Sequence, residues 1–245
     1  MADSFVAIDA GNTRIKWGGH VRGAWTSRGV IATADAAWLR DAAEDWPTDA
    51  RVVICNVAGA AVADAIGAAL SGLPLRPVNF VSSAECCGVS NRYERPSQLG
   101  ADRWAALVGA RSITSQACIV VCAGTATTVD VLDADGVFQG GVILPGFDLM
   151  RASLASNTAQ LPLAEGKFEP RPRNTVDAIV SGCLQAQAGA IERMFASIAA
   201  QPDALCVMTG GAAERLAPHL NIPLRLADNL ILDGLVRYGA SLPAA

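Results

Sequence analysis

Two short segments of this chain follow the same plan, and that repetition limits what the chain can fold into. Residues 5–16 read FVAIDAGNTRIK, and residues 119–130 read IVVCAGTATTVD. Each is an apolar, β-branched run, then a tight turn with glycine and a hydroxyl residue, then a second strand-like run. Glycine in such a turn lets backbone N–H groups close on an anion, and Asn and Thr side chains add donors. The pair indicates a duplicated domain that holds one polyphosphate from two sides.

Either segment taken alone is also compatible with an ordinary β-hairpin, because glycine and asparagine are common turn residues. Asp9 and Lys16, which flank the first turn, favour a phosphate site instead. A carboxylate at a strand end is suited to orienting Mg²⁺ or its water shell, and lysine supplies positive charge to phosphates. We therefore interpret the first turn as a phosphate-binding turn with Mg²⁺ nearby.

Composition excludes several classes of protein. The 245 residues are 51% hydrophobic, enough for one large core or two modest ones, and the formal net charge is −4. The basic residues form no stripe, so no nucleic-acid surface is expected. No basic N-terminal region precedes an apolar stretch, and no run of about 18 apolar residues occurs, so neither a signal peptide nor a membrane span is expected. We expect a cytoplasmic protein.

The cysteines agree with a reducing compartment. There are seven, an odd number, and the chain has only two histidines and no Cys-x-x-Cys motif, so a zinc site has little support. Buried, reduced thiols are expected. Four cysteines lie in or at the ends of apolar strand-like runs: Cys55, Cys118, Cys122 and Cys206.

Strand and helix patterns alternate along the chain in two blocks. The first predicts strands at 5–9, 13–18, 24–27, 52–56 and 78–81, with helices near 34–43 and 60–70. The second predicts strands at 119–122, 127–132, 137–143 and 205–208, with helices near 148–156, 175–200, 212–217 and 232–240. Three strands in hairpin order, followed by alternating helices and strands, indicate a mixed sheet. The expected domains are residues 1–115 and 116–245.

A third motif lies between the two blocks. Tyr93 is followed by Gly100-Ala101-Asp102-Arg103 and then by an alanine-rich helical stretch. Gly100 permits a close backbone approach, and Asp102 stands at a helix start, where acidic residues are common caps. From the local sequence alone, Asp102 is explained equally well as a helix cap and as a functional residue of the site.

Taken in order, these motifs resemble those of the type III pantothenate kinases, which belong to the superfamily of actin, sugar kinases and heat-shock ATPases. The resemblance covers nearly the whole chain. It implies an α/β fold of two actin-like (ribonuclease H-like) domains, with mixed sheets flanked by helices and an ATP cleft between them. It rests on Asp9-x-Gly11-Asn12-Thr13-x-x-Lys16, Tyr93, Gly100-Ala101-Asp102-Arg103, residues 124–130 and 140–146, Asn174-Thr175 and Thr209-Gly210-Gly211.

The activity that the resemblance implies is transfer of the ATP γ-phosphoryl group to the primary hydroxyl of pantothenate, giving 4′-phosphopantothenate for coenzyme A biosynthesis. Asp102 is then the catalytic base, since an ionised carboxylate within hydrogen-bond reach can accept the hydroxyl proton. The expected substrate-binding residues are Tyr93, Gly100, Ala101, Asp102, Arg103 and Thr175. Arg103 is assigned to the pantothenate carboxylate. The expected nucleotide-binding residues are Asp9, Ala10, Gly11, Asn12, Thr13, Arg14, Ile15, Lys16, Thr125, Gly210 and Gly211, with Mg²⁺ held through water at Asp9.

One residue departs from the family pattern. Cys122 stands where many members resemble Asp-x-Gly-Thr-Ala-x-Thr, with the leading aspartate helping to hold a monovalent cation. A neutral thiol is a soft, poor ligand for K⁺ or NH₄⁺. Any monovalent cation site is therefore expected to be weakened or built differently.

The resemblance also implies a homodimer in which Thr175 reaches pantothenate bound by the other subunit. The helix predicted over 175–200 carries a stripe of apolar residues, which a buried intramolecular helix would show equally well. Two other functions stay open: a non-catalytic ligand-binding regulator on the same fold, and a kinase of another small hydroxy acid. The stripe consists of Ile179, Cys183, Ala186, Ala190, Met194 and Ile198.

Overall fold

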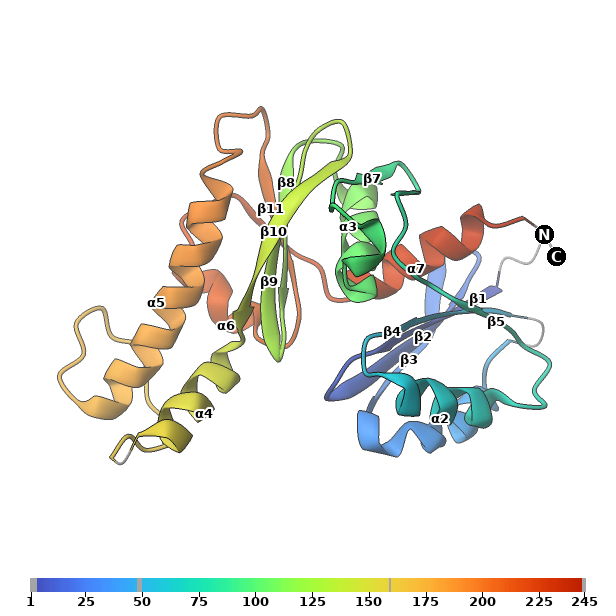
Figure 1. Cartoon of the computed structure of the whole chain (residues 1–245), viewed down its shortest axis with the longest axis horizontal. Helices are drawn as coiled ribbons and strands as arrows, with labels where there is room; N and C mark the ends of the chain where they lie inside the picture. Colours follow the sequence, from blue (N-terminus) through green and yellow to red (C-terminus); the bar gives the residue numbers. More distant parts are fainter. Residues whose placement is uncertain (1–3, 48–49, 159, 244–245) are drawn as a thin grey trace. The chain divides into compact units, whose positions relative to one another are not determined.

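The computed structural model describes residues 4–47, 50–158 and 160–243 (Figure 1). Spatial contacts divide the chain into two compact units. Unit 1 runs to Ile113 and includes the chain again from Asn229, whereas unit 2 is Thr114–Asp228. The C-terminal helix therefore groups with the N-terminal part of the chain, and not with residues 116–228 as the predicted boundary has it. The physical reason is packing, because this helix contacts three strands and a helix of unit 1.

Unit 1 is built on a mixed sheet of five strands. Their order is β3 (Ala24–Ala32), β2 (Arg14–Val21), β1 (Ser4–Ala10), β4 (Arg51–Asn56) and β5 (Arg76–Asn79). The first three pair antiparallel, and β4 and β5 run parallel to β1. This is the mixed arrangement that the hairpin order of the opening strands predicts.

Helices cover both faces of this sheet (Figure 1). The 3-10 segment η1 (Thr33–Trp38), α1 (Leu39–Ala43) and α2 (Ala60–Leu70) cover one face, where the core includes Val6, Ile8, Leu39 and Ile66. The other face is covered by α3 (Ala101–Ile113) and α7 (Leu230–Ser241). Alternation along β1 therefore directs Phe5, Ala7 and Asp9 toward α3 and α7. Before α3 come a short hairpin of β6 (Glu85–Cys86) and β7 (Val89–Asn91), and the 3-10 turn η2 (Pro96–Gln98).

Two glycines let α3 and α7 approach to backbone contact. A Cβ on Gly109 would overlap the carbonyl oxygen of Leu230, and one on Gly234 would overlap that of Ala105. Any larger residue would push the helices apart, since close-packed interiors hold no spare volume. Because Asp102 is in the first turn of α3, this crossing helps to set where its carboxylate lies.

Unit 2 repeats the plan of unit 1. Its strands follow the order β10 (Val137–Pro145), β9 (Ala126–Leu132), β8 (Cys118–Ala123), β11 (Leu205–Thr209) and β12 (Leu224–Leu226). The first three pair antiparallel, and β11 and β12 run parallel to β8. The mixed α/β fold class is thus confirmed. The helices of unit 2 are α4 (Phe147–Asn157), α5 (Thr175–Phe195) and α6 (Ala213–Leu216), and α6 leads into the 3-10 turn η3 (Ala217–His219).

The apolar stripe predicted on residues 175–200 is divided by the fold. Ile179, Cys183 and Ile198 lie in the core of unit 2, whereas Ala186 is exposed, and α5 ends at Phe195. The intramolecular alternative therefore holds for the larger side chains. Burial within unit 2 does not explain the exposed small residues of α5.

All seven cysteines are thiols, as predicted. Cys55, Cys118, Cys183 and Cys206 are buried, and the other three are half-buried. Among the helices of the described ranges, none combines the length and the apolarity that crossing a bilayer requires.

Candidate active site

A half-buried aspartate and a second carboxylate meet in unit 1. Asp9 is the penultimate residue of β1, and Asp102 is in the first turn of α3, which packs on the same face of the sheet. Burial and the negative charge of Asp102 raise the pKa of Asp9 to about 7, while Lys16, its partner across the β1–β2 pair, acts in the opposite direction. The tertiary structure thus brings together the two aspartates that the sequence analysis selected.

Cys55 lies beside this pair and was not selected from the sequence as a site residue. It is the β4 neighbour of Asp9 in the parallel register and is fully buried. Burial, followed by the charges of Asp9 and Asp102, raises the pKa of the Cys55 thiol well above its ordinary value. Cys55 therefore lines the site as an uncharged thiol. No local motif marks it, because only strand pairing makes it a neighbour of Asp9.

The carboxylates form a donor set that suits Mg²⁺. Two like charges held close, one of them desolvated, are unfavourable unless a proton or a cation offsets them. Carboxylate oxygens and water are the ligands that Mg²⁺ prefers. Desolvation and the charge of Asp102 bring the pKa of Asp9 to about 7. A bound cation would offset this charge, so Asp9 fits the expected role of orienting a hydrated metal ion.

Asp102 has both the local and the chemical features that its sequence suggested. Its Oδ1 accepts a hydrogen bond of 2.8 Å from the backbone N–H of Arg103. The N–H of Trp104 bonds to the carbonyl oxygen of Gly100 at 3.0 Å, which starts the helix there. A carboxylate in the first helical turn is stabilised by the helix dipole. The hydrogen bond from Arg103 thus fixes the orientation of the Asp102 carboxylate, which can accept a proton near Asp9.

Arg103 and Tyr93, both predicted to bind substrate, are in contact. The Arg103 side chain is only 4% exposed, and its Nη1 donates to the Tyr93 hydroxyl at 2.9 Å. Its guanidinium carbon also lies 5.7 Å from the centre of the Tyr93 ring. Asn91 orients Tyr93 in turn, since its Oδ1 accepts from the Tyr93 N–H at 3.0 Å. A guanidinium held in this way is suited to bidentate recognition of a carboxylate.

The first predicted phosphate-binding turn joins β1 to β2. The N–H of Gly11 bonds to the carbonyl oxygen of Arg14 at 3.1 Å, and the Thr33 hydroxyl donates to the carbonyl oxygen of Gly11 at 2.6 Å. Thr33 lies far along the chain, so sequence reasoning missed it. Asn12, Thr13 and Arg14 are exposed and Gly11 and Lys16 are half-buried, whereas Ala10 and Ile15 are fully buried and have only backbone groups to offer a nucleotide.

The second predicted phosphate-binding turn, Gly124-Thr125, joins β8 to β9 in unit 2. Gly124 donates to the carbonyl oxygen of Ala126 at 3.0 Å, and Gly146 donates to that of Thr125 at 2.8 Å. A Cβ on Gly146 would overlap the Gly124 carbonyl oxygen, and one on Gly210 would overlap that of Ala123. Gly210 therefore lies against the end of β8 that leads into this turn, and Gly211 follows it in the chain. Gly146, which lies in the matching segment 140–146, also encloses this turn.

Cys122 lies in β8 between two threonines. Its register partners are Thr128 on β9 and Thr209 on β11. The Thr128 hydroxyl is buried and, within the described part of the chain, has no hydrogen-bond partner. The strand neighbours of Cys122 are therefore neutral hydroxyl groups, which do not replace the missing carboxylate as a hard anionic ligand.

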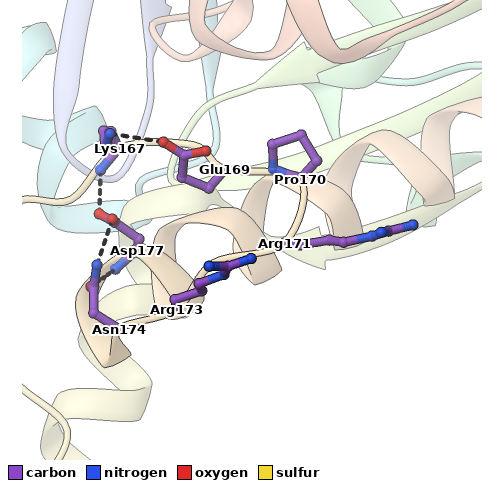
Figure 2. Close-up of a pocket in the computed structure, with 7 residues that line it drawn as sticks. All are labelled: Lys167, Glu169, Pro170, Arg171, Arg173, Asn174 and Asp177. Carbon is purple, nitrogen blue, oxygen red and sulfur yellow. Dashed lines mark hydrogen bonds and ion pairs between the residues drawn. The ribbon is translucent and has the colours of Figure 1, made fainter.

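Thr175 begins α5, but it is not the helix cap. The side chain of Asn174 accepts from the backbone N–H of Asp177 at 2.9 Å, so Asn174 has that role and Thr175 is exposed. A pocket of about 740 Å³ lies at this helix start. The residues that line it, drawn in Figure 2, are Lys167, Glu169, Pro170, Arg171, Arg173, Asn174 and Asp177.

Solved structures share this fold. A protein named as a Baf family transcriptional activator, from Campylobacter jejuni, aligns with a TM-score of 0.67 over 97% of this chain and 100% of its own, at 18% identity. A protein named as a 2-dehydro-3-deoxygalactonokinase, from Sinorhizobium meliloti, aligns with a TM-score of 0.61 over 98% and 100%, at 17% identity. At such identities the likeness concerns the fold alone. The duplicated mixed sheet thus places this chain in the actin-like and sugar-kinase class of folds.

Sequence comparison identifies the family within that class. The model of the type III pantothenate kinase family matches residues 5–197. A type III pantothenate kinase of Aromatoleum aromaticum is 60% identical over 229 residues, covering 93% of this chain and 94% of that protein. One from an Azoarcus species is 51% identical over 237 residues, covering 96% and 90%. The chain belongs to the type III pantothenate kinase family.

Proposed function

We propose that this protein phosphorylates pantothenate with ATP, yielding 4′-phosphopantothenate in the first step of coenzyme A biosynthesis. The observation that carries the proposal is the group of Asp9, Lys16 and Asp102 next to the buried Arg103, which is hydrogen-bonded to Tyr93, in a member of this family. A regulator that only binds a ligand has no need of a carboxylate with a raised pKa next to a second carboxylate. A cytoplasmic location stays a prediction from composition.

In this proposal Asp102 accepts the proton of the primary hydroxyl as the phosphoryl group is transferred. Phosphoryl transfer has a loose transition state, so catalysis depends mainly on positioning and on charge stabilisation. Arg103 holds the substrate carboxylate, and Tyr93 keeps the guanidinium in place. Gly100 and Ala101 contribute backbone close to the substrate.

The nucleotide phosphates are assigned to the turn from Asp9 to Lys16 and to Thr125, and adenosine to Gly210 and Gly211. Asp9 would hold hydrated Mg²⁺, which neutralises phosphate charge when it is bound. That both turns hold the same nucleotide stays a prediction, as does the ATP cleft between the domains.

The test is an assay with ATP, Mg²⁺ and pantothenate in which the product is identified by mass. A product heavier by one phosphate, absent without ATP, is the expected result. A panel of other small hydroxy acids tests the runner-up kinase function. Binding of pantothenate by calorimetry without turnover would instead favour the regulator.

We also propose that the monovalent cation site is weak because of Cys122. The substitution Cys122→Asp adds a hard anionic oxygen, so the half-saturating K⁺ concentration should fall roughly tenfold, the ratio that corresponds to about 1.4 kcal/mol. Titration of activity with K⁺ or NH₄⁺ measures it.

The matched control is Cys122→Asn, which adds an oxygen but no charge. Without K⁺, the aspartate variant should be less stable than the asparagine variant, because a desolvated carboxylate lacks a partner. Equal half-saturation in Cys122→Asp and wild type would rule out this role of residue 122.

We further propose a homodimer that shares its substrate sites. Its support on this chain is the exposed small-residue face of α5, formed by Ala178, Gly182, Ala186 and Gly189, since small residues permit close helix packing. Thr175 begins the same helix. The proposed contact is from Thr175 of one subunit to pantothenate held by Asp102 and Arg103 of the other.

Mixing two inactive variants tests this arrangement. Asp102→Asn and Thr175→Ala chains, re-paired into mixed dimers, should recover activity, because one of the two sites then has both defects and the other has neither. Each variant alone, taken through the same re-pairing, is the control. Confirmed mixed dimers without recovery, or a monomer in sedimentation at assay concentration, would exclude a shared site.

A further inference from the structure

The β6–β7 hairpin carries two adjacent cysteines that the proposed reaction does not use. Cys86 ends β6 and pairs with Val89, so Cys87 and Gly88 are the two central residues of the turn. The two sulfur atoms are 3.6 Å apart, and both side chains are half-buried. The turn thus presents a preformed pair of thiols at the surface of unit 1.

The backbone of this turn is unusual for cysteine. Cys87 has φ of +50° and Gly88 has φ of +76°, the combination of a two-residue hairpin turn that normally takes Asn-Gly or Asp-Gly. A side chain other than Gly, Asn or Asp is disfavoured there. Strain of this kind, kept where a better residue is available, is typical of functional positions.

Arg237 of α7 holds the turn in place. Its Nη2 donates to the carbonyl oxygen of Cys87 at 3.0 Å, and the Cys87 thiol donates to the carbonyl oxygen of Arg237 at 3.8 Å. Burial and the neighbouring Cys87 raise the pKa of Cys86 to about 12, although the charge of Arg237 acts against this. At neutral pH Cys86 is therefore a protonated thiol, and a ligand must displace its proton on binding.

The geometry favours a bridging atom over a direct disulfide. Adjacent α-carbons are about 3.8 Å apart, below the usual range for disulfides, and sulfurs at 3.6 Å would have to move to about 2.05 Å. One atom bonded to both sulfurs requires no such closure. Among the described residues no group of three or more His, Cys, Asp or Glu could hold a metal ion, so a four-ligand ion such as Zn²⁺ does not fit.

We propose that Cys86 and Cys87 form a dithiol site for trivalent arsenicals. In the reaction R–As=O + 2 R′SH → R–As(SR′)₂ + H₂O, two S–H bonds break and two As–S bonds form. The oxygen leaves as water with both protons, and nothing is oxidised or reduced. Soft thiol ligands are matched to such a soft, thiophilic centre.

The site connects to the substrate side of the protein, a consequence that rests on the proposed function. β7 ends at Asn91, whose Nδ2 donates to the carbonyl oxygens of Ser83 and Pro96 at 3.2 Å each, and whose Oδ1 orients Tyr93. Capture of an arsenical in the turn is therefore expected to raise KM for pantothenate more than KM for ATP.

The test uses phenylarsine oxide on the full, reduced chain, with intact mass and a count of remaining thiols. We expect one adduct per chain, two thiols lost, resistance to excess glutathione and reversal by a small dithiol. Cys86→Ser and Cys87→Asn should each lose the glutathione-resistant adduct. Asparagine suits the turn, so Cys87→Asn should melt no lower than wild type, which keeps loss of binding distinct from unfolding.

The control variant is Cys122→Ser, which removes the remaining half-buried thiol and should keep the adduct. The site would be refuted if wild type formed no resistant adduct, if Cys87→Asn kept it, or if Cys122→Ser lost it. Because the adduct is read by mass, these results do not depend on kinase activity. An adduct that leaves both KM values unchanged would refute only the link to Tyr93.

Discussion

Asp102→Asn is expected to lower turnover by roughly 10²–10⁴, the range typical of removing a general base. Asparagine keeps the shape of the side chain and its hydrogen bond from the N–H of Arg103, but it cannot accept a proton. Binding of ATP should change little. Single-turnover kinetics, in which chemistry limits the rate, give the cleanest measurement.

Asp64→Asn is the matched control, because Asp64 is an exposed carboxylate on α2 of the same unit. Its turnover should equal that of wild type. An Asp102→Asn enzyme that kept more than about a tenth of wild-type single-turnover rate would remove Asp102 from the role of base.

Asp9→Asn is expected to stabilise the protein without ligands while impairing the reaction. The pKa of Asp9 is about 7 in the folded protein against an ordinary 3.8, so the folded state holds this proton more tightly than the unfolded state does. The resulting stability is complete below about pH 3.8, declines as pH rises, and is lost above about pH 7. Such a difference corresponds at most to about 4 kcal/mol.

Thermal denaturation from pH 4.5 to 8 measures this effect. Neutral asparagine does not titrate, so the Tm of Asp9→Asn should exceed that of wild type by an increasing margin up to about pH 7, reaching several degrees. Added Mg²⁺ with nucleotide should raise the Tm of wild type more than that of the variant. In kinetic assays, Asp9→Asn should lose more in turnover than in its affinity for pantothenate.

Asp64→Asn again serves as the control for the removal of an exposed carboxylate from the same unit. A Tm of Asp9→Asn equal to or below that of wild type at pH 8 would contradict the raised pKa. An unchanged response to Mg²⁺ would instead leave Asp9 with a structural role. The two results are separable because the first is measured without ligands.

Local patterns predicted most of the elements. Residues 60–70 were predicted as a helix and are α2, and the strand and helix order of both blocks is confirmed. Alternating and helical periodicities depend on near neighbours in the chain, so the sequence itself contains them. The strands β6, β7 and β12 were missed because two or three residues are too few to show a period.

Local sequence patterns predict the duplicated mixed fold and the two glycine turns, and the ordered set of motifs that includes Gly-Ala-Asp-Arg points to the family. Packing of the folded chain places α7 in unit 1, puts Cys55 beside Asp9, and brings Asp102 close enough to raise the pKa of Asp9. The physical reason is that burial and like-charge repulsion arise between groups far apart in the chain. No local pattern encodes them, because they exist only once packing has brought β1 and α3 together.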